Sequence, residues 1–237
     1  MCQSIGGVTQ KHAIKFYVQL AFGEKAKDVF DAKDFKTLVN LCLRQSWGPA
    51  FSHVSENAGN ITNSNKEDKI QGCIKNLLNL YCDYFQKDNK SDYLRDNENE
   101  FKNRLHDCKE TDSIKNPITI GHFQKLFNMT TKHLLTLYLL RDYIWDNDGP
   151  FAKFDEKDIE DFFKHADCPI DSKILDKVDT KPNNKWSQFD YDDYSDVQSE
   201  ISKKVGENKS NLFYDFEYWQ TKKAKKSNQS YTPKWTY

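Results

Sequence analysis

The sequence predicts an all-α protein, and three observations support that fold class. Among 237 residues only 9 are glycine and 6 are proline, the two residue types that most often interrupt helices. No run of alternating apolar and polar residues, bounded by turn signals, predicts a strand. Apolar side chains instead recur at intervals of three and four residues over much of the chain, which is the spacing of an amphipathic helix.

Eight segments carry this helical spacing. The longest places Phe123, Phe127 and Leu134 along one stripe, as the buried face of a helix requires. Glycine, proline, asparagine and serine gather near 109–117, 146–150, 180–184 and 206–210 and predict turns there. The predicted helical segments are 13–22, 35–43, 70–85, 118–140, 159–163, 174–178, 197–205 and 212–219.

The polar stretch 55–68, rich in Asn, Ser and Glu, is the best candidate for a loop or linker. We expect a multi-helix bundle of two lobes with a cleft between them. The N-terminal helical lobe would span 1–105 and share its core with the C-terminal helices. A second lobe would span 106–180, and 181–237 would hold the C-terminal helices and a basic tail.

Composition narrows the class of protein. There is no apolar run of the length of a membrane span and no signal-peptide pattern, so we expect a cytoplasmic protein without a membrane partner. The 6 cysteines are scattered and are interpreted as reduced thiols, with no metal site. A net charge of −1 argues against indiscriminate binding of polyanions.

The basic tail after Glu217 is either a solvated terminus or a tether for nucleic acid. Its lysines and aromatic residues are Lys222, Lys223, Lys225, Lys226, Lys234, Tyr231, Trp235 and Tyr237.

A polar stripe accompanies the apolar stripe of segment 118–140. Gln124 precedes Asn128 by four residues, and Lys125 precedes Asn128 by three and Lys132 by seven, so these side chains share one side of the helix. The stripe is either a solvent face or a site. Lys125 lies near the start of the predicted helix, where the dipole disfavours an ammonium and lowers its pKa. Such an amine can act as a nucleophile and form a Schiff base at a sugar carbon.

Asp171 follows Pro169 and Ile170 and precedes an apolar helical run, so the sequence predicts a helix N-cap there. Backbone amides and the helix dipole would keep this carboxylate ionised. An anionic aspartate can stabilise an oxocarbenium-like sugar as a base departs and can exchange protons with the amine. The alternative is a cap with no further role.

These residues resemble the helix-hairpin-helix DNA glycosylases, particularly the 8-oxoguanine branch and its archaeal relatives. Gly121-x-x-x-Lys125 resembles that family's catalytic lysine after a glycine, and Pro169-Ile170-Asp171 resembles its catalytic aspartate motif. The resemblance covers about residues 105–180 and implies a hairpin-like catalytic lobe at 106–180. It also implies removal of a modified base from DNA by Lys125 and Asp171, with no cofactor and no obligate protein partner.

The chain departs from the family pattern in two places. Residues 118–122 stand where the family has a Gly-x-Gly hairpin that grips phosphate, and the interval from Lys125 to Asp171 is longer, which predicts an insertion at 143–163. The same motifs, together with Trp186-Ser187, Tyr194 with Gln198, and 216–219, resemble a group of bacterial proteins. The residues expected to contact DNA or the flipped base are Gly121, His122, Gln124, Asn128, Lys132, Trp186, Glu217 and Trp219.

The substrate base and two other functions stay open at this point. Oxidised guanine is what the resemblance implies, and a hypermodified base of viral DNA is a second option. A ribonuclease of the HEPN type is suggested by the spacing of Asn128 and His133, although Phe127 stands where that motif has arginine. A non-catalytic helical module, binding nucleic acid or protein, needs no special chemistry at Lys125 or Asp171.

Overall fold

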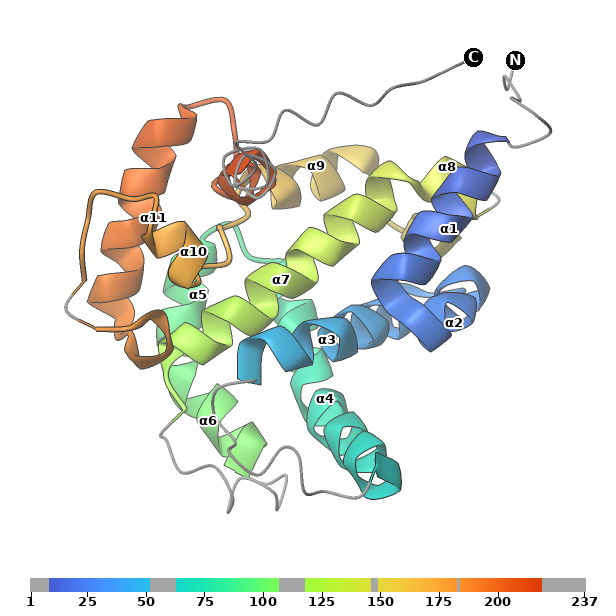
Figure 1. Ribbon diagram of the computed structural model, residues 1–237, viewed down its shortest axis with the longest axis horizontal. Helices are drawn as coiled ribbons and strands as arrows, with labels where there is room; N and C mark the ends of the chain where they lie inside the picture. Colours follow the sequence, from blue (N-terminus) through green and yellow to red (C-terminus); the bar gives the residue numbers. More distant parts are fainter. Residues whose placement is uncertain (1–8, 52–62, 107–117, 146–148, 183, 219–237) are drawn as a thin grey trace, which may run out of the picture.

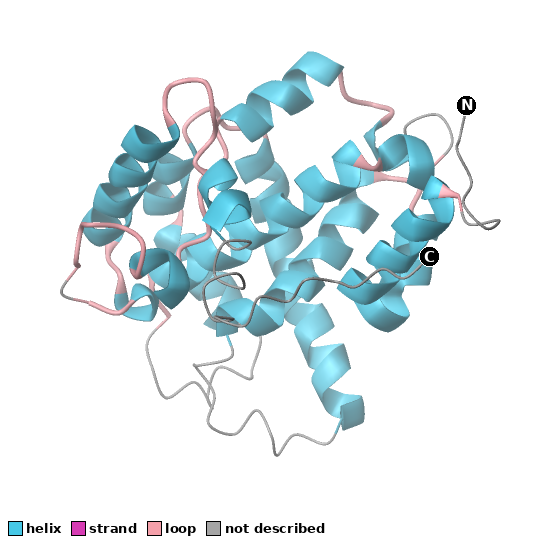
Figure 2. Ribbon diagram, turned by 45° about the horizontal axis from the view of Figure 1, so that its top comes forward, coloured by secondary structure: helices cyan, strands magenta, loops and turns pink. Residues whose placement is uncertain are grey.

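A computed structural model describes residues 9–51, 63–106, 118–145, 149–182 and 184–218, and the description of side chains omits 63–69 and 106. Every regular element among these residues is helical, and Figure 2 shows no strand among them, so the all-α prediction is confirmed. Within the described residues, no helix combines the length and apolar character needed to cross a membrane. The two lobes and the cleft between them stay a prediction.

Figure 1 shows how the helices are arranged around α7 (Ile120–Leu139). Short 3-10 turns lie at Gly23–Lys25 (η1), Gly149–Phe151 (η3) and Trp186–Gln188 (η4), and residues 212–218 are helical. The α-helices are α1 (Gln10–Phe22), α2 (Ala26–Asp31), α3 (Phe35–Phe51), α4 (Asn63–Phe85), α5 (Lys90–Asp96), α6 (Glu98–His106), α7 (Ile120–Leu139), α8 (Arg141–Ile144), α9 (Glu156–Lys164), α10 (Ser172–Leu175) and α11 (Tyr191–Val205).

Helix α7 is the centre of the structure (Figure 1). It packs along α3 and also contacts α5, α6, α8, α11 and η4. Its buried residues include apolar Phe123 and Phe127 and polar Gln124 and Asn128 on a different side, so the helix is covered nearly all round. A helix in this position needs polar partners inside the protein for each buried polar side chain.

Aromatic side chains form much of the core around α7. Phe123 stacks on Phe101 of α6 with ring centroids 4.1 Å apart, and Phe127 meets Tyr81 and Tyr84 of α4 edge to face at 5.0 and 5.3 Å. Offset and edge-to-face geometries are those that aromatic quadrupoles prefer. The buried apolar residues form one continuous cluster that includes members of all three predicted ranges, 1–105, 106–180 and 181–237.

The structure corrects the predicted organisation of the chain in two places. The predicted loop 55–68 is wrong in its second half, because α4 begins at Asn63. Once the apolar segment from 70 onward forms a helix, extending it by polar residues costs little, since nucleation is the expensive step. The sequence also missed α5 and α6, whose apolar residues are too few to give a periodic signal; Tyr93, Leu94 and Phe101 anchor them in the core.

Candidate active site

The first turn of α7 is fixed by a capping box. Thr119 is the N-cap in extended conformation, its Oγ1 accepts from Gly121 N at 3.2 Å, and the His122 ring accepts from Thr119 N at 3.2 Å. The His122 ring lies nearly parallel to that of Phe51, with centroids 5.9 Å apart, and meets Trp186 edge to face. His122 is therefore a buried cap residue that orders the start of the helix.

Gly121 lets η4 approach α7 more closely than any side chain would allow. A Cβ placed on Gly121 would lie 1.8 Å from the carbonyl oxygen of Trp186. Thr119 Oγ1 donates to the carbonyl oxygen of Ser187 at 3.0 Å, so a hydrogen bond also joins the start of α7 to η4. This close approach brings the Trp186 indole next to α7.

Lys125 lies on that indole. Its Nζ is 4.1 Å from the centroid of the Trp186 ring and 3.9 Å from Asp171 Oδ2, and only 9% of its side chain is exposed. Burial lowers the pKa of Lys125. The Asp171 carboxylate raises this pKa, the Lys173 ammonium lowers it, and the Asp215 carboxylate raises it. The lowered pKa agrees with the sequence prediction, and its main cause is burial rather than the helix dipole, because Lys125 is in the second turn of α7, where the dipole has faded.

Asp171 is the N-cap of α10, as the sequence predicts. Its Oδ1 accepts from Lys173 N at 2.9 Å and from Ile174 N at 3.1 Å, while its Oδ2 faces Lys125. Oδ1 thus accepts hydrogen bonds from the first amides of α10, and Oδ2 faces the Lys125 amine. The carboxylate is more accessible than the amine, with 24% of its side chain exposed.

The segment before Asp171 is held by two glutamine side chains. Gln124 Nε2 donates to the Ile170 carbonyl at 3.0 Å, and Gln124 Oε1 accepts from Ile170 N at 3.1 Å. Gln198 of α11 makes the same pair with Cys168, at 2.7 and 3.2 Å. Each carboxamide therefore satisfies both polar groups of one buried peptide residue.

Asn128 belongs to a deeper network. It is fully buried, accepts from Tyr84 OH at 2.8 Å, and donates to Tyr194 OH at 3.1 Å and to the Cys168 carbonyl at 3.3 Å. Tyr194 in turn donates to Asp167 Oδ2 at 2.7 Å. The side chain of Asn128 is therefore engaged in hydrogen bonds inside the protein, and contact with DNA stays a prediction.

A second ion pair lies further along α7. Lys132, two turns after Lys125, pairs with Asp215 from the helical stretch 212–218, and its Nζ is 5.3 Å from the centroid of the Phe216 ring. Asp215 is 3% exposed, and burial raises the pKa of its carboxyl against the opposing effect of Lys132. The charges of Asp215 and Asp171 influence one another, so the two pairs form one charged region.

The structure does not bring every predicted site residue together. Lys125, Asp171 and Trp186 meet, and Gly121, His122, Gln124 and Asn128 support them from inside the protein. Lys132 lies two turns further along α7 and meets Asp215. Glu217 is exposed, and Trp219 and the basic tail lie outside the described residues. Asp215 is not among the site residues predicted from the sequence, which are Glu217 and Trp219 in this segment; its spacing of three from Leu212 was the available signal that it faces inward.

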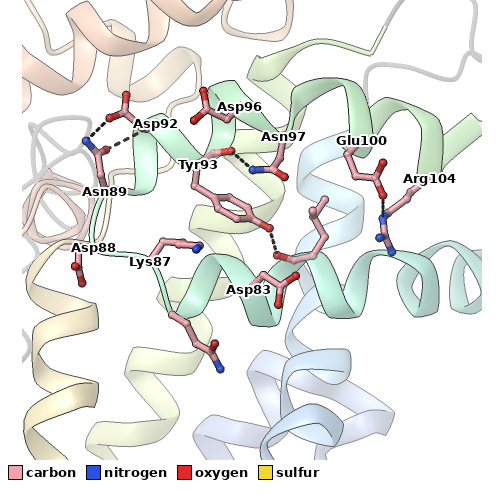
Figure 3. A pocket seen from close by; sticks show the side chains of 12 residues that line it. Asp83, Lys87, Asp88, Asn89, Asp92, Tyr93, Asp96, Asn97, Glu100 and Arg104 are labelled. Atoms are coloured by element: carbon pink, nitrogen blue, oxygen red, sulfur yellow. Dashed lines mark hydrogen bonds and ion pairs between the residues drawn. The ribbon is translucent and has the colours of Figure 1, made fainter.

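A separate hollow of about 870 Å³ lies between the end of α4 and helices α5 and α6 (Figure 3). Its lining is acidic, but Asp92 pairs with Arg95 and Glu100 with Arg104. Tyr93 points across it and donates to the Leu80 carbonyl at 2.9 Å. Within the described part of the chain, no three metal-binding side chains converge here or elsewhere. Lys125, Asp171 and Trp186 are not part of this lining.

Comparison of the chain with protein-family models, with curated proteins and with solved structures gives no match. Inference about function therefore depends on the geometry around Lys125. The ribonuclease alternative would need Asn128 and His133 to face RNA together. Asn128 is enclosed by its hydrogen bonds, and the His133 ring packs against Phe22, with centroids 5.7 Å apart, so no observation favours it.

Proposed function

We propose that the protein is a DNA glycosylase that removes a modified base, with Lys125 as the nucleophile and Asp171 as its carboxylate partner. The single observation that carries the proposal is the meeting of a buried lysine amine and an N-cap carboxylate, 3.9 Å apart, over the Trp186 ring. A lowered lysine pKa and a geometrically fixed carboxylate are the two requirements of amine catalysis at a sugar carbon.

The proposed chemistry begins with a neutral Lys125 amine, whose fraction at neutral pH rises as its pKa falls. Its lone pair bonds to C1′ of the deoxyribose while the bond from C1′ to the base breaks and its electrons leave with the base. The nitrogen then gives up a proton, which passes through Asp171 to the departing base. Asp171, as an anion, also stabilises the positive charge that develops on the sugar.

The same intermediate leads to a Schiff base, from which strand nicking would follow as C2′ loses a proton and the bond from C3′ to its phosphate oxygen breaks. The nitrogen lone pair forms a double bond to C1′ as the bond from C1′ to O4′ breaks, and O4′ takes a proton from water. The product is a protonated Schiff base between Lys125 and the opened sugar. Borohydride adds hydride to that carbon and fixes the protein to the DNA, which makes the intermediate measurable.

The Lys132–Asp215 pair supports the proposal from a second direction. It supplies a donor and an acceptor, partly buried, on the same helix as the nucleophile and two turns away. Two turns of helix rise about 10 Å, so the pair lies further along α7 than the amine that would attack the sugar. We propose that this pair lies at the base end of the site and that the predicted cleft between lobes admits the nucleotide.

A non-catalytic role has one observation in its favour. With 9% of its side chain exposed, Lys125 is covered to the extent expected of a structural ion pair in a helical interaction module. Under that alternative, the pair would contribute to stability, and DNA carrying a modified base would be no better a ligand than unmodified DNA.

A trapping experiment separates the two. Duplexes and single strands carrying different modified bases, including 8-oxoguanine, are incubated with the protein and scored for abasic sites and for borohydride-trapped adducts. We expect trapping with at least one lesion, loss of trapping in Lys125→Gln, and a fall of about 10²- to 10⁴-fold in base release in Asp171→Asn. Lys164→Gln, which changes an exposed lysine on α9 that does not act on Lys125, is the matched control and should keep trapping. Equal base release by wild type, Lys125→Gln and Asp171→Asn would refute the proposal.

A further inference from the structure

The side chain of Gln124 connects α7 to the segment that carries Asp171. Gln124 makes two hydrogen bonds to Ile170, at 3.0 and 3.1 Å, and its amide also donates to the Gly121 carbonyl at 3.0 Å. The side chain is fully buried, so water does not compete for these bonds. We call the two bonds between Gln124 and Ile170 the Gln124 clamp.

The clamp fixes a register between helix and segment. Lys125 follows Gln124 on α7, and Asp171 follows Ile170 on the segment, so the gripped pair is adjacent in sequence to the pair of charged residues. The backbone of Asp171 is extended, with φ −137° and ψ −178°, so its side chain leaves the segment just beyond the clamp. The distance between Lys125 Nζ and Asp171 Oδ2 therefore depends on where the clamp holds Ile170.

Other contacts do not set this distance as directly. Gln198 and Asn128 both bind Cys168, three residues before Asp171, and the intervening Pro169 has no N–H to anchor. The cap bonds from Lys173 N and Ile174 N tie Asp171 to α10, a helix of 4 residues, rather than to α7. Among these hydrogen bonds, those to Ile170 join the residue beside Asp171 to the helix that bears Lys125.

We propose that Gln124 is a positioning residue whose clamp on Ile170 sets the contact between Lys125 and Asp171. Gln124 does not touch the reacting sugar under this proposal. The catalytic consequence rests on the proposed function, whereas the geometric claim is independent of any substrate. A carboxamide is suited to the task because one side chain donates to the carbonyl and accepts from the N–H of the same residue.

The pKa of Lys125 reports the contact without DNA. The charged groups that act on Lys125 are Asp171, Lys173 and Asp215, and the Asp171 anion raises its pKa more than the other two change it. Releasing Ile170 would let Asp171 move away, and the pKa of Lys125 would fall. Reductive methylation of the lysines with ¹³C-formaldehyde gives one NMR resonance pair per lysine, and Lys125→Arg assigns the resonance to be titrated.

Gln124→Met removes both clamp bonds with little change in volume and adds no charge next to Lys125. We expect the pKa of Lys125 to fall by about 1 in Gln124→Met and in Asp171→Asn. The double variant should show no larger fall than Asp171→Asn alone, because both changes remove the same contact. Amide NMR spectra of each variant confirm that the chain is folded.

Gln198→Met is the matched control, since it removes an equivalent two-bond clamp from Cys168. It should lower the pKa of Lys125 by less than a third of the effect of Gln124→Met. An unchanged pKa in Gln124→Met would overturn the proposal, as would equal effects of Gln198→Met and Gln124→Met.

A kinetic measurement tests the catalytic consequence. On a DNA substrate that wild type cleaves, Gln124→Met should reduce kcat by about tenfold or more with KM nearly unchanged, because transition-state positioning is lost while binding is kept. Full kcat in Gln124→Met would overturn the positioning role. If wild type cleaves no DNA, the proposed function fails, and the NMR titration still decides whether Gln124 sets the contact.

Discussion

Replacing Gly121 by alanine tests the close approach that brings Trp186 to Lys125. The added Cβ would lie 1.8 Å from the carbonyl oxygen of Trp186 and 2.9 Å from its carbonyl carbon, and Cβ contacts under 3.0 Å are essentially never seen. The backbone of η4 must therefore retreat from 1.8 to at least 3.0 Å, a shift of at least 1.2 Å. The atom in the way is backbone, so no side-chain rotation can relieve the overlap.

The cost of this shift follows from the contacts that it disturbs. Overpacking of a tight interface costs about 1–3 kcal/mol. The hydrogen bond from Thr119 Oγ1 to Ser187 O, now 3.0 Å, would lengthen, with a loss of about 1 kcal/mol. Alanine regains roughly 1 kcal/mol of helix propensity in α7. The net prediction is a destabilisation of about 1–3 kcal/mol in Gly121→Ala.

The assay is urea-induced unfolding followed by circular dichroism, with Gly72→Ala in α4 as the control. A Cβ on Gly72 meets nothing within 4 Å, so that variant should gain up to about 1 kcal/mol. In Gly121→Ala, the near-ultraviolet signal of tryptophan should also change, because the Trp186 indole leaves the Lys125 ammonium. Equal stability of the two alanine variants, with an unaltered tryptophan signal, would refute the close approach.

Two further predictions concern the pH dependence of stability, each measured by urea unfolding between pH 4 and pH 8. Burial, with a smaller effect of Lys132, lowers the pKa of His133 to about 4, below the unfolded value of about 6.5, so the unfolded state binds the proton first. Stability should fall between about pH 6.5 and 4, by roughly 2–3 kcal/mol at pH 4.5, and His133→Leu should remove that loss. Burial raises the pKa of Asp167, although hydrogen bonds from Tyr194 and Ser91 act to lower it. The ionised carboxylate therefore destabilises the folded state at pH 7, and this destabilisation disappears as the pH falls and Asp167 binds a proton. Asp167→Asn should therefore gain stability relative to wild type at pH 7 and lose that gain near pH 4, and a gain that is constant with pH would contradict the cause given.

The features that the sequence predicted well are those decided by neighbours along the chain. The spacing of Phe123, Phe127 and Leu134 predicts α7 because a helix repeats every 3.6 residues, and Asp171 predicts a cap because a cap bonds only to the next few amides. α4 was predicted only from residue 70 because its first residues are polar and carry no periodic apolar signal. Asp215 was overlooked in favour of Glu217 because its partner, Lys132, is 83 residues away in the chain.

The polar stripe on α7 illustrates the limit of spacing as evidence. Gln124, Lys125, Asn128 and Lys132 were expected to form either a solvent face or a DNA-contacting face, and periodicity treats all four alike. In the structure their environments differ, because different elements cover successive turns. Gln124 and Asn128 meet the backbone at 168–170, Lys125 meets Trp186, and Lys132 meets Asp215.

That division gives the stripe a consistent physical interpretation. The two amides are neutral, so they can be buried as long as partners inside the protein satisfy their hydrogen bonds. Through these bonds they hold the segment that ends at Asp171. The two ammonium groups cannot be buried without an anion, and each meets one carboxylate, Asp171 or Asp215, at the edge of the described core. The protein thus uses the amides to set the positions of the charges. A change at Gln124 should consequently move Asp171 away from Lys125, whereas a change at Lys173, exposed on α10, should remove one nearby charge and leave the contact between Lys125 and Asp171 in place.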